Sequence, residues 1–232
     1  MSDQQALRRI PSKTQALITL KARGVPVATV IDVGIERGTP ELIEIFGDLE
    51  HILFEPVQEF AGPIAHAYRA VRYLLIDKAV SDRTGEAVIE VSAITGGEVT
   101  HSGLVDATSA GPGRRTVKVT RLDDALKPLN LAAPYLLKVD IDGKELRVLA
   151  GATETLAKCS VVIVEVAVYE FGERLVVMER AGFTLFDLVE PCYYDGALWQ
   201  CDAIFIRSDL QREHFQNLHD GYEEEKYQMF KG

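Results

Sequence analysis

The sequence predicts an α/β fold, with a mostly parallel sheet covered by helices on both faces. Short runs rich in Val, Ile and Leu alternate with helical patterns, and these runs lack the polar alternation of a sheet with one wet face. Near the end of the chain, two strand-like runs are joined by a short connection, which requires antiparallel pairing. The length of 232 residues, with 47% hydrophobic residues, favours one large domain over two small ones.

Composition narrows the classes of partner. The net charge of −10 argues against nucleic acid or an anionic membrane as the main partner. No apolar run approaches the roughly 18 residues of a membrane helix, and the first residues are polar, so we expect a cytoplasmic protein. Its three cysteines show no CxxC spacing, which argues against a disulfide framework and a zinc site.

The first elements have clear boundaries. Ser12 and Gln15 stand at capping-box spacing and predict a helix over 12–26 that closes at a glycine and a proline. The β-branched run 28–33 then predicts a central parallel strand. A helix follows, with Thr39 as its cap and a proline in its first turn.

The same alternation continues to the end of the sheet. The predicted elements are strand 51–55, helix 57–68, strand 72–81, strand 135–141 and its helix, strand 160–166, a helix near 175–181, and strands 183–189 and 197–207. We expect one domain over 1–232: the helix 12–26, a core over 27–208 with an insertion over 86–119, and a helical tail over 209–232.

The insertion interrupts the alternation with two strand-like pieces around a glycine-rich loop. Long loops of this kind are either functional or disordered, and the functional interpretation is a lid over the active site. His101 in this loop is a candidate base, although a single loop histidine is more often just exposed. Arg114 and Arg115 are candidates for an anionic acceptor or for solvated surface.

The turn after the first strand, Asp32-Val33-Gly34-Ile35-Glu36-Arg37-Gly38, resembles a nucleotide-binding glycine turn with one difference. A dinucleotide fingerprint needs glycine at position 32 so that pyrophosphate can approach the backbone. Asp32 would repel pyrophosphate but would accept hydrogen bonds from a ligand with an ammonium group, such as S-adenosylmethionine. The alternative is an aspartate that caps the helix.

Acidic residues at the ends of the next strands extend this pattern. Glu55, followed by Pro56, lies 21 residues after Gly34, where a carboxylate binds both ribose hydroxyls of an adenosine; the alternative is an exposed glutamate before a helix. Ser81 and Asp82 end the third predicted strand and could meet the adenine amino group, although Asp82 also fits a turn.

Charged residues stand at the carboxyl end of the predicted strand 135–141. Period 2 places Lys138, Asp140 and Asp142 on one side, at the sheet edge where open α/β folds bind ligands. Asp140 could hold the cofactor, act as general base or ligate a divalent cation, with Glu165 beside it at the end of the next strand. The alternative is a purely structural ion pair of Lys138.

The order and spacing of these stretches resemble the FkbM-type methyltransferases over residues 12 to 210 or so. The stretches that match are Val30–Gly34 with Gly38, Phe54–Pro56, Ala79–Asp82, Val119–Asp124, Leu137–Glu145 and Asp202–Arg207. The resemblance implies a class I methyltransferase, a Rossmann-like three-layer sandwich whose seven strands run 3-2-1-4-5-7-6 with only strand 7 antiparallel. It also implies S-adenosylmethionine as donor and a hydroxyl of a sugar, polysaccharide or natural product as acceptor. The chain differs at Ile35-Glu36, where the family usually has Ala-Asn.

These residues predict a mechanism. Asp140, helped by Lys138, Glu145 or Glu165, would align the acceptor hydroxyl and take its proton, directly or with a metal ion. Tyr193, Tyr194 and Trp199 would either stack on a sugar ring or pack within the closing hairpin. The rival functions are a protein that binds the cofactor or a partner without catalysis and, less favoured, a nicotinamide-dependent oxidoreductase.

Overall fold

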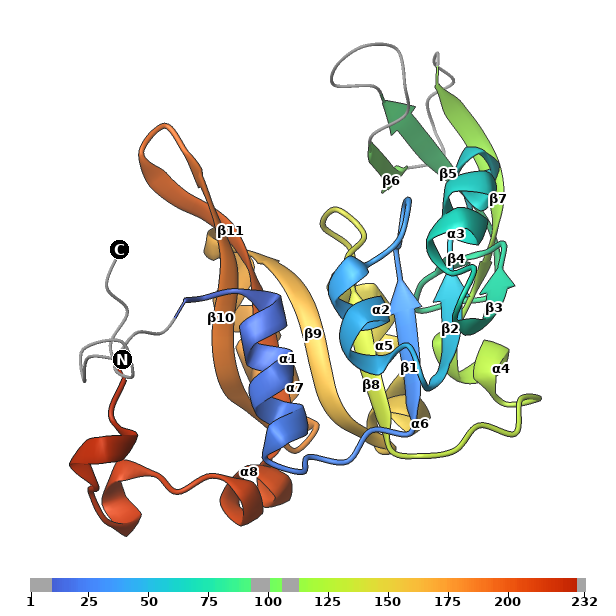
Figure 1. The fold of residues 1–232 in the computed structure, drawn as a ribbon. Coiled ribbons are helices and arrows are strands. Elements are labelled where there is room, and N and C mark those ends of the chain that lie inside the picture. The colour runs from blue at the N-terminus through green and yellow to red at the C-terminus, as the bar shows by residue number, and fades with distance from the viewer. Residues whose placement is uncertain (1–9, 93–100, 106–112, 229–232) are drawn as a thin grey trace.

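The protein is described by a computed structural model that covers residues 10–92, 101–105 and 113–228. Its main sheet has seven strands in the order β10-β11-β9-β8-β1-β2-β3, and only β11 runs antiparallel to its neighbours (Figure 1). The strands are β1 (Thr29–Val33), β2 (Glu50–Phe54), β3 (Arg72–Ile76), β8 (Tyr135–Val139), β9 (Cys159–Ala167), β10 (Phe183–Tyr194) and β11 (Ala197–Arg207). This order confirms the class I methyltransferase fold that the sequence implies.

Helices cover both faces of this sheet and make it a three-layer sandwich (Figure 1). One face packs against α1 (Lys13–Ala22), α2 (Pro40–Phe46) and α8 (Ser208–His214). The other packs against α4 (Leu122–Leu126), α5 (Glu145–Ala150), α6 (Thr153–Leu156) and α7 (Phe171–Arg180). The central strands β1 and β8 are buried at every position, which explains their continuous apolar runs.

The cap predicted for the first helix is present. The Ser12 side chain accepts a hydrogen bond from the backbone N–H of Gln15 at 3.2 Å. Thr39 is the N-cap of α2, but its hydroxyl donates to Asp32 instead of capping the helix. The predicted helix 57–68 is divided into the 3₁₀ turn η1 (Gln58–Phe60) and α3 (Ala61–Ala67).

The insertion forms a second sheet of four strands in the order β4-β7-β5-β6. Its strands are β4 (Ala79–Val80), β5 (Gly85–Ser92), β6 (His101–Val105) and β7 (Arg114–Thr120). The predicted strand 72–81 is therefore divided, because β4 leaves the main sheet to pair with β7. His101 lies in β6, where its backbone pairs with Ser92, and not in a loop as predicted. The loop between 91 and 116, which is predicted to be a lid, includes residues 93–100 and 106–112, and these lie outside the described residues.

The turn of the last hairpin and the tail that follows β11 both differ from the prediction. β10 continues through most of the predicted connection 190–196 and turns at Asp195 and Gly196, whose φ angles are 50° and 78°. Positive φ at two central residues is the geometry of a tight hairpin turn. Regular α-helix after β11 ends at His214, and as far as residue 228, where the described chain stops, only two short 3₁₀ turns follow, η3 (Leu218–Asp220) and η4 (Glu224–Lys226). The apolar residues of this tail do not recur on one helical face, so little packing is available to hold a longer helix.

No described helix is long and apolar enough to cross a membrane.

Candidate active site

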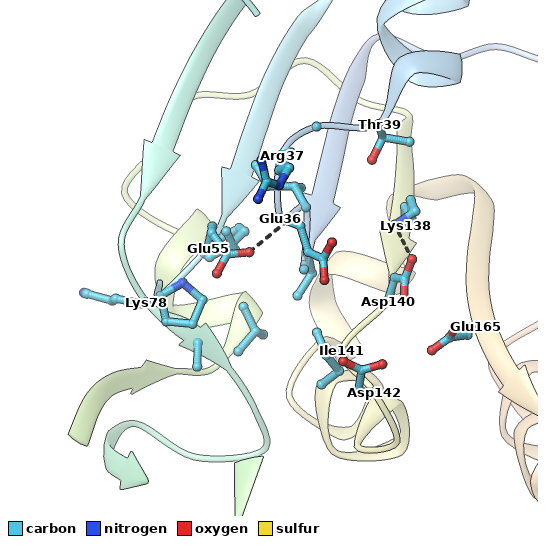
Figure 2. Close-up of a pocket in the computed structure, with 18 of the residues that line it drawn as sticks. Glu36, Arg37, Thr39, Glu55, Lys78, Lys138, Asp140, Ile141, Asp142 and Glu165 are labelled. Carbon is cyan, nitrogen blue, oxygen red and sulfur yellow. Dashed lines mark hydrogen bonds and ion pairs between the residues drawn. The ribbon is translucent and has the colours of Figure 1, made fainter. Parts of the chain in front are cut away.

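A cavity of about 340 Å³ opens at the carboxyl ends of the parallel strands (Figure 2). Residues from β1, β2, β8 and β9 and the turns that follow them line it, as expected for an open α/β sheet. Six acidic and four basic residues contribute: Glu36, Glu41, Glu55, Asp140, Asp142 and Glu165, and Lys13, Arg37, Lys78 and Lys138.

The turn after β1 fits tightly against the end of β8. Gly34 has a φ of +78°, and a Cβ atom at this position would lie 1.7 Å from the backbone oxygen of Asp140. Gly38, with a φ of +127°, leaves room for the side chains of Ala67 and Tyr68 of the α3 segment. A side chain at position 34 would collide with the backbone of Asp140, so this fold requires glycine there.

Asp32 lies beneath this turn and does not line the cavity. Its side chain is fully buried, accepts a hydrogen bond from the Thr39 hydroxyl at 2.7 Å and stands 3.7 Å from the Lys138 ammonium. Burial raises the pKa of Asp32 despite the opposing charge of Lys138. In this structure, Asp32 therefore holds the turn and Lys138 in place, whereas the sequence had favoured direct contact with a ligand.

Glu55 lines the cavity and also fastens the glycine turn. One carboxylate oxygen accepts the backbone N–H of Glu36 at 3.0 Å, and the other accepts that of Val57 at 2.9 Å (Figure 2). Burial raises the pKa of Glu55 to about 7. Each oxygen keeps a lone pair for a ligand hydroxyl.

Neither of the predicted adenine contacts, Ser81 and Asp82, lines the cavity, whereas Pro56, which follows Glu55, does. The Ser81 hydroxyl donates to the Asp82 carboxylate at 3.1 Å. Lys78 and the two residues after it line the wall at this end instead.

Lys138 and Asp140 lie side by side at the end of β8 (Figure 2). The Lys138 ammonium donates to the Asp140 carboxylate at 2.8 Å. Burial opposes the charge of Asp140, but Lys138 outweighs burial and holds the pKa of that carboxyl below its usual range. Burial also opposes the charge of Lys138, and the carboxylates of Asp140 and Asp32 outweigh it and raise its pKa. Asp140 is thus a fixed anion facing the cavity.

Glu165 faces Asp140 from β9 (Figure 2). The Gln200 amide donates to one Glu165 oxygen at 2.6 Å. Burial, together with the nearby negative charge of Asp140, raises the pKa of Glu165 to about 8. Asp140 is thus the ionised member of this pair of acidic side chains, and Glu165 is the one that more readily holds a proton.

An ion pair between Lys13 and Asp202 lies at the site, and no local motif marks Lys13. The Lys13 ammonium, at the start of α1, lines the cavity and pairs with the Asp202 carboxylate of β11 at 2.7 Å. The Lys13 backbone N–H donates to Glu190, 177 residues away, at 2.7 Å. Contacts between such distant segments leave no spacing that a sequence pattern can reveal.

Glu145 does not reach the cavity. It is buried, accepts the backbone N–H of Gly143 at 2.7 Å and pairs with the Arg174 guanidinium at 2.5 Å. Arg174 also binds Glu170 at 2.6 Å. Glu145 therefore ties the turn after β8 to α7, which is a structural role.

The remaining candidates lie away from the cavity lining. Arg114 pairs with Glu90 at 2.9 Å, and Arg115 pairs with Glu59 at 2.6 Å. His101 is described only by its backbone. Among the described residues, no group of three His, Cys, Asp or Glu side chains is placed to hold a metal ion.

The raised pKa values predict a stability that falls as pH rises. Between their ordinary values near 4.5 and their folded values of about 7 and 8, Glu55 and Glu165 hold more protons in the folded chain than in the unfolded chain. Their stabilising effect is complete below pH 4.5 and is lost as pH rises through about 8. Urea unfolding should show that the free energy of unfolding falls by about 2 kcal/mol between pH 5 and pH 8.5. This is less than the two pKa shifts alone imply, because solvent reaches Glu165 and weakens the effect.

Glu165→Gln should flatten this pH dependence. Glu173→Gln, at an exposed position on α7, should leave it unchanged. A wild-type stability that rises over this range, or equal slopes in wild type and Glu165→Gln, would contradict the assignment.

The comparisons with known proteins agree with this geometry. The family model described as methyltransferase FkbM domain matches residues 30–185, which include Gly34, Glu55, Asp140 and Glu165. No curated protein matches the chain.

Among solved structures, methyltransferase FkbM from Methylobacillus flagellatus KT is 16% identical, with a TM-score of 0.51 over 87% of this chain and 49% of that one. The chain thus spans about half the length of that relative. Fibrillarin pre-rRNA processing protein from Methanococcus jannaschii is 11% identical, with a TM-score of 0.49 over 85% of this chain and 75% of that one. Magnesium protoporphyrin IX methyltransferase from Synechocystis PCC 6803, solved with bound SAM, is 10% identical, with a TM-score of 0.45 over 83% of this chain and 76% of that one.

Proposed function

Because the chain belongs to the methyltransferase FkbM domain family, we propose that it transfers the methyl group of S-adenosylmethionine to a hydroxyl oxygen of a sugar or another small molecule. The observation that carries this proposal is the cavity in which Gly34, Glu55 and Asp140 meet. The same three residues come from the three strand ends that bind ligands in open α/β sheets.

The chemistry of the cavity fits this cofactor. Acidic residues outnumber basic ones, and Lys138 and Lys13 are already paired with Asp140 and Asp202, so the lining favours a ligand with positive charge. Glu55 offers two carboxylate oxygens to ribose hydroxyls, and the missing side chain at Gly34 leaves the backbone open. We propose Gly34, Glu55 with Pro56, and Asp140 as the cofactor-binding residues.

S-adenosylmethionine, when bound, supplies a methyl group that is already activated by a cationic sulfur. What remains for the chain is to align the acceptor and handle one proton. Asp140, kept ionised by Lys138, accepts a hydrogen bond from the acceptor hydroxyl and orients it. Glu165 takes the proton, because a carboxylate with a pKa near 8 is a stronger base than one held ionised by a lysine. A divalent cation is not needed in this scheme.

Calorimetry with S-adenosylhomocysteine tests the cofactor assignment. We expect the wild type to bind S-adenosylhomocysteine and not NAD, and Glu55→Gln to weaken binding at least about tenfold through the loss of a charged hydrogen-bond acceptor. Glu44→Gln, at an exposed position on α2, is the matched control and should bind like the wild type. Thermal melts followed by circular dichroism show whether Glu55→Gln remains folded.

Binding of NAD, or a folded wild-type protein without affinity for S-adenosylhomocysteine, would overturn the proposal. A protein that binds the cofactor without catalysis is the second candidate, since Glu36 takes a φ of 47° where the family usually has an asparagine. Methyl transfer to a panel of polyols, glycosides and phenols separates the two: transfer supports an enzyme, and binding without transfer supports the second candidate.

A further inference from the structure

The last hairpin projects beyond the main sheet and carries two exposed aromatic side chains that contact each other (Figure 1). Tyr194 is 75% exposed and Trp199 is 49% exposed. Their ring centroids lie 6.2 Å apart, and the ring planes are tilted by 56°. The sequence favoured packing of these residues within the hairpin, but the contact between the two rings leaves a large part of each side chain open to solvent.

Trp199 is an extra residue in β11. Cys192 and Tyr193 are adjacent on β10, but their partners on β11, Gln200 and Leu198, are two residues apart. Such a β-bulge disrupts the hydrogen-bond ladder and is over-represented next to active sites, where it redirects a side chain. Without Trp199, Leu198 and Gln200 would be adjacent and would still lie on opposite faces of the hairpin. The pairing of the two strands therefore does not require this residue.

The aromatic pair, Tyr194 and Trp199, lies on the face of the hairpin that leads to the cavity. Residues directly opposite each other share a face, so Gln200 lies on the face of Cys192, and Tyr194, two residues after Cys192, lies there too. The ring contact with Tyr194 places Trp199 on the same face. Gln200 lines the cavity and donates to Glu165. Two residues of strand span about 7 Å, so the aromatic pair begins close to the cavity.

Tyr193 and Leu198 are exposed as well, but they lie on the other face of the hairpin. They pair with each other, and Cys201, which alternates with Gln200, shares their face. Cys201 packs into the core on the side of the sheet covered by α4, α5, α6 and α7, away from the cavity. The hairpin thus offers a matched control, because Tyr193 is an exposed aromatic residue beside the aromatic pair but on the opposite face.

We propose that Tyr194, Trp199 and Gln200 form the subsite that binds a pyranose ring of the acceptor. This proposal rests on the proposed function and names its substrate class. A pyranose has an apolar C–H face that packs on an aromatic ring and hydroxyl groups that need hydrogen-bond partners. The aromatic pair offers the apolar surface, and the amide of Gln200 and the carboxyl groups of Glu165 and Asp140 offer the polar partners.

This combination favours a sugar over other ligands. An acyclic polyol has the hydroxyl groups but no flat apolar face, so the subsite should discriminate against it. A simple phenol has the flat face but only one hydroxyl group for the polar residues at the cavity end. A second copy of the chain is the rival occupant of the aromatic pair, and the continuity of the pair with the cavity favours the acceptor.

Saturation-transfer NMR with methyl glycosides of glucose, galactose, mannose and rhamnose, in the presence of S-adenosylhomocysteine, tests the subsite. We expect ring C–H signals for at least one glycoside and a much weaker signal for sorbitol. Trp199→Ala should reduce the glycoside signal at least about fivefold, because it removes the larger of the two aromatic surfaces. Trp199→Phe should retain most of the signal, and Tyr193→Ala, on the opposite face, should retain all of it.

Deletion of Trp199 tests the role of the bulge. The deletion makes the pairing of β10 with β11 regular at this point and leaves the other hairpin side chains on their faces. We expect this variant to lose the glycoside signal. Calorimetry should show unchanged S-adenosylhomocysteine binding for the deletion and for each substitution, which also shows that the variants remain folded.

An undiminished signal in Trp199→Ala, equal loss in Trp199→Ala and Tyr193→Ala, an equal signal for sorbitol, or no glycoside signal in a protein that binds S-adenosylhomocysteine would each overturn the subsite. Sedimentation velocity covers the rival: a wild-type dimer that Trp199→Ala dissociates would assign the aromatic pair to a second copy. Failure of the proposed function is a different result, because S-adenosylhomocysteine would then not bind at all.

Discussion

Replacing Gly34 by alanine is expected to lower the free energy of unfolding by about 3 kcal/mol and to abolish binding of S-adenosylhomocysteine. The new Cβ would lie 1.7 Å from the backbone oxygen of Asp140 and 2.8 Å from the Ile141 side chain, and the φ of +78° disfavours any side chain. Overpacking costs typically 1 to 3 kcal/mol, and the left-handed conformation adds about 1 kcal/mol. This clash can be relieved only if the turn after β8 moves, and that movement would displace Asp140.

Gly172→Ala is the matched control. A Cβ on Gly172, in the first turn of α7, would meet nothing within 4 Å. Its expected effect is neutral or a stabilisation of up to about 1 kcal/mol, because alanine restricts the unfolded chain. Urea unfolding and calorimetry measure both variants, and a Gly34→Ala protein with wild-type stability and affinity would refute the tight contact between the two turns.

Glu165→Gln is expected to reduce methyl transfer by about 10²- to 10⁴-fold, the usual contribution of a general base, while binding of S-adenosylhomocysteine is retained. Asp140→Asn should reduce transfer as well, and it should also destabilise the protein because it leaves the Lys138 ammonium without its closest anion. The measurement is transfer of a labelled methyl group to the acceptor panel, with Glu173→Gln as control.

The pH profile separates the roles of the two carboxyl groups. Transfer by the wild type should increase with pH toward about 8 as Glu165 ionises, and Glu165→Gln should lose this increase. Glu165→Gln with wild-type turnover would remove this residue from the chemistry. Retained turnover in a folded Asp140→Asn protein would do the same for Asp140.

The residues that were correctly predicted to line the cavity lie at the ends of predicted strands. Gly34, Glu55 and Asp140 each follow or end a predicted parallel strand, and the topology alone brings such positions together. The strand order was implied by the resemblance to the FkbM-type methyltransferases, whereas the residues alone predicted a parallel sheet that closes with an antiparallel hairpin.

Other parts depended on packing that no local pattern specifies. Asp32 was expected to meet a ligand, but β1 is buried at every position, and its carboxylate is used by Thr39 and Lys138 inside the protein. Glu145 is an acidic residue shortly after β8, as expected for a catalytic group. Its carboxylate is instead paired with the guanidinium of Arg174, which lies 29 residues later on α7.

Glu36 shows how a substitution relative to the family is accommodated. Its φ of 47° lies in the left-handed region, which asparagine enters far more readily than glutamate. Glutamate here therefore occupies a backbone conformation that suits it less well than it would suit asparagine. Its side chain extends into the cavity among the other carboxylates (Figure 2).

The ion pair between Lys13 and Asp202 has a consequence for biosynthesis. Lys13 is synthesised before the first strand of the main sheet, and Asp202 is added only when β11, the last strand of that sheet in chain order, is made. Until then the cavity lacks Gln200 from its lining, and β9 has an open edge that β11 will later occupy. A nascent chain can thus pair five of the seven strands, β3, β2, β1, β8 and β9, before the cavity lining is complete.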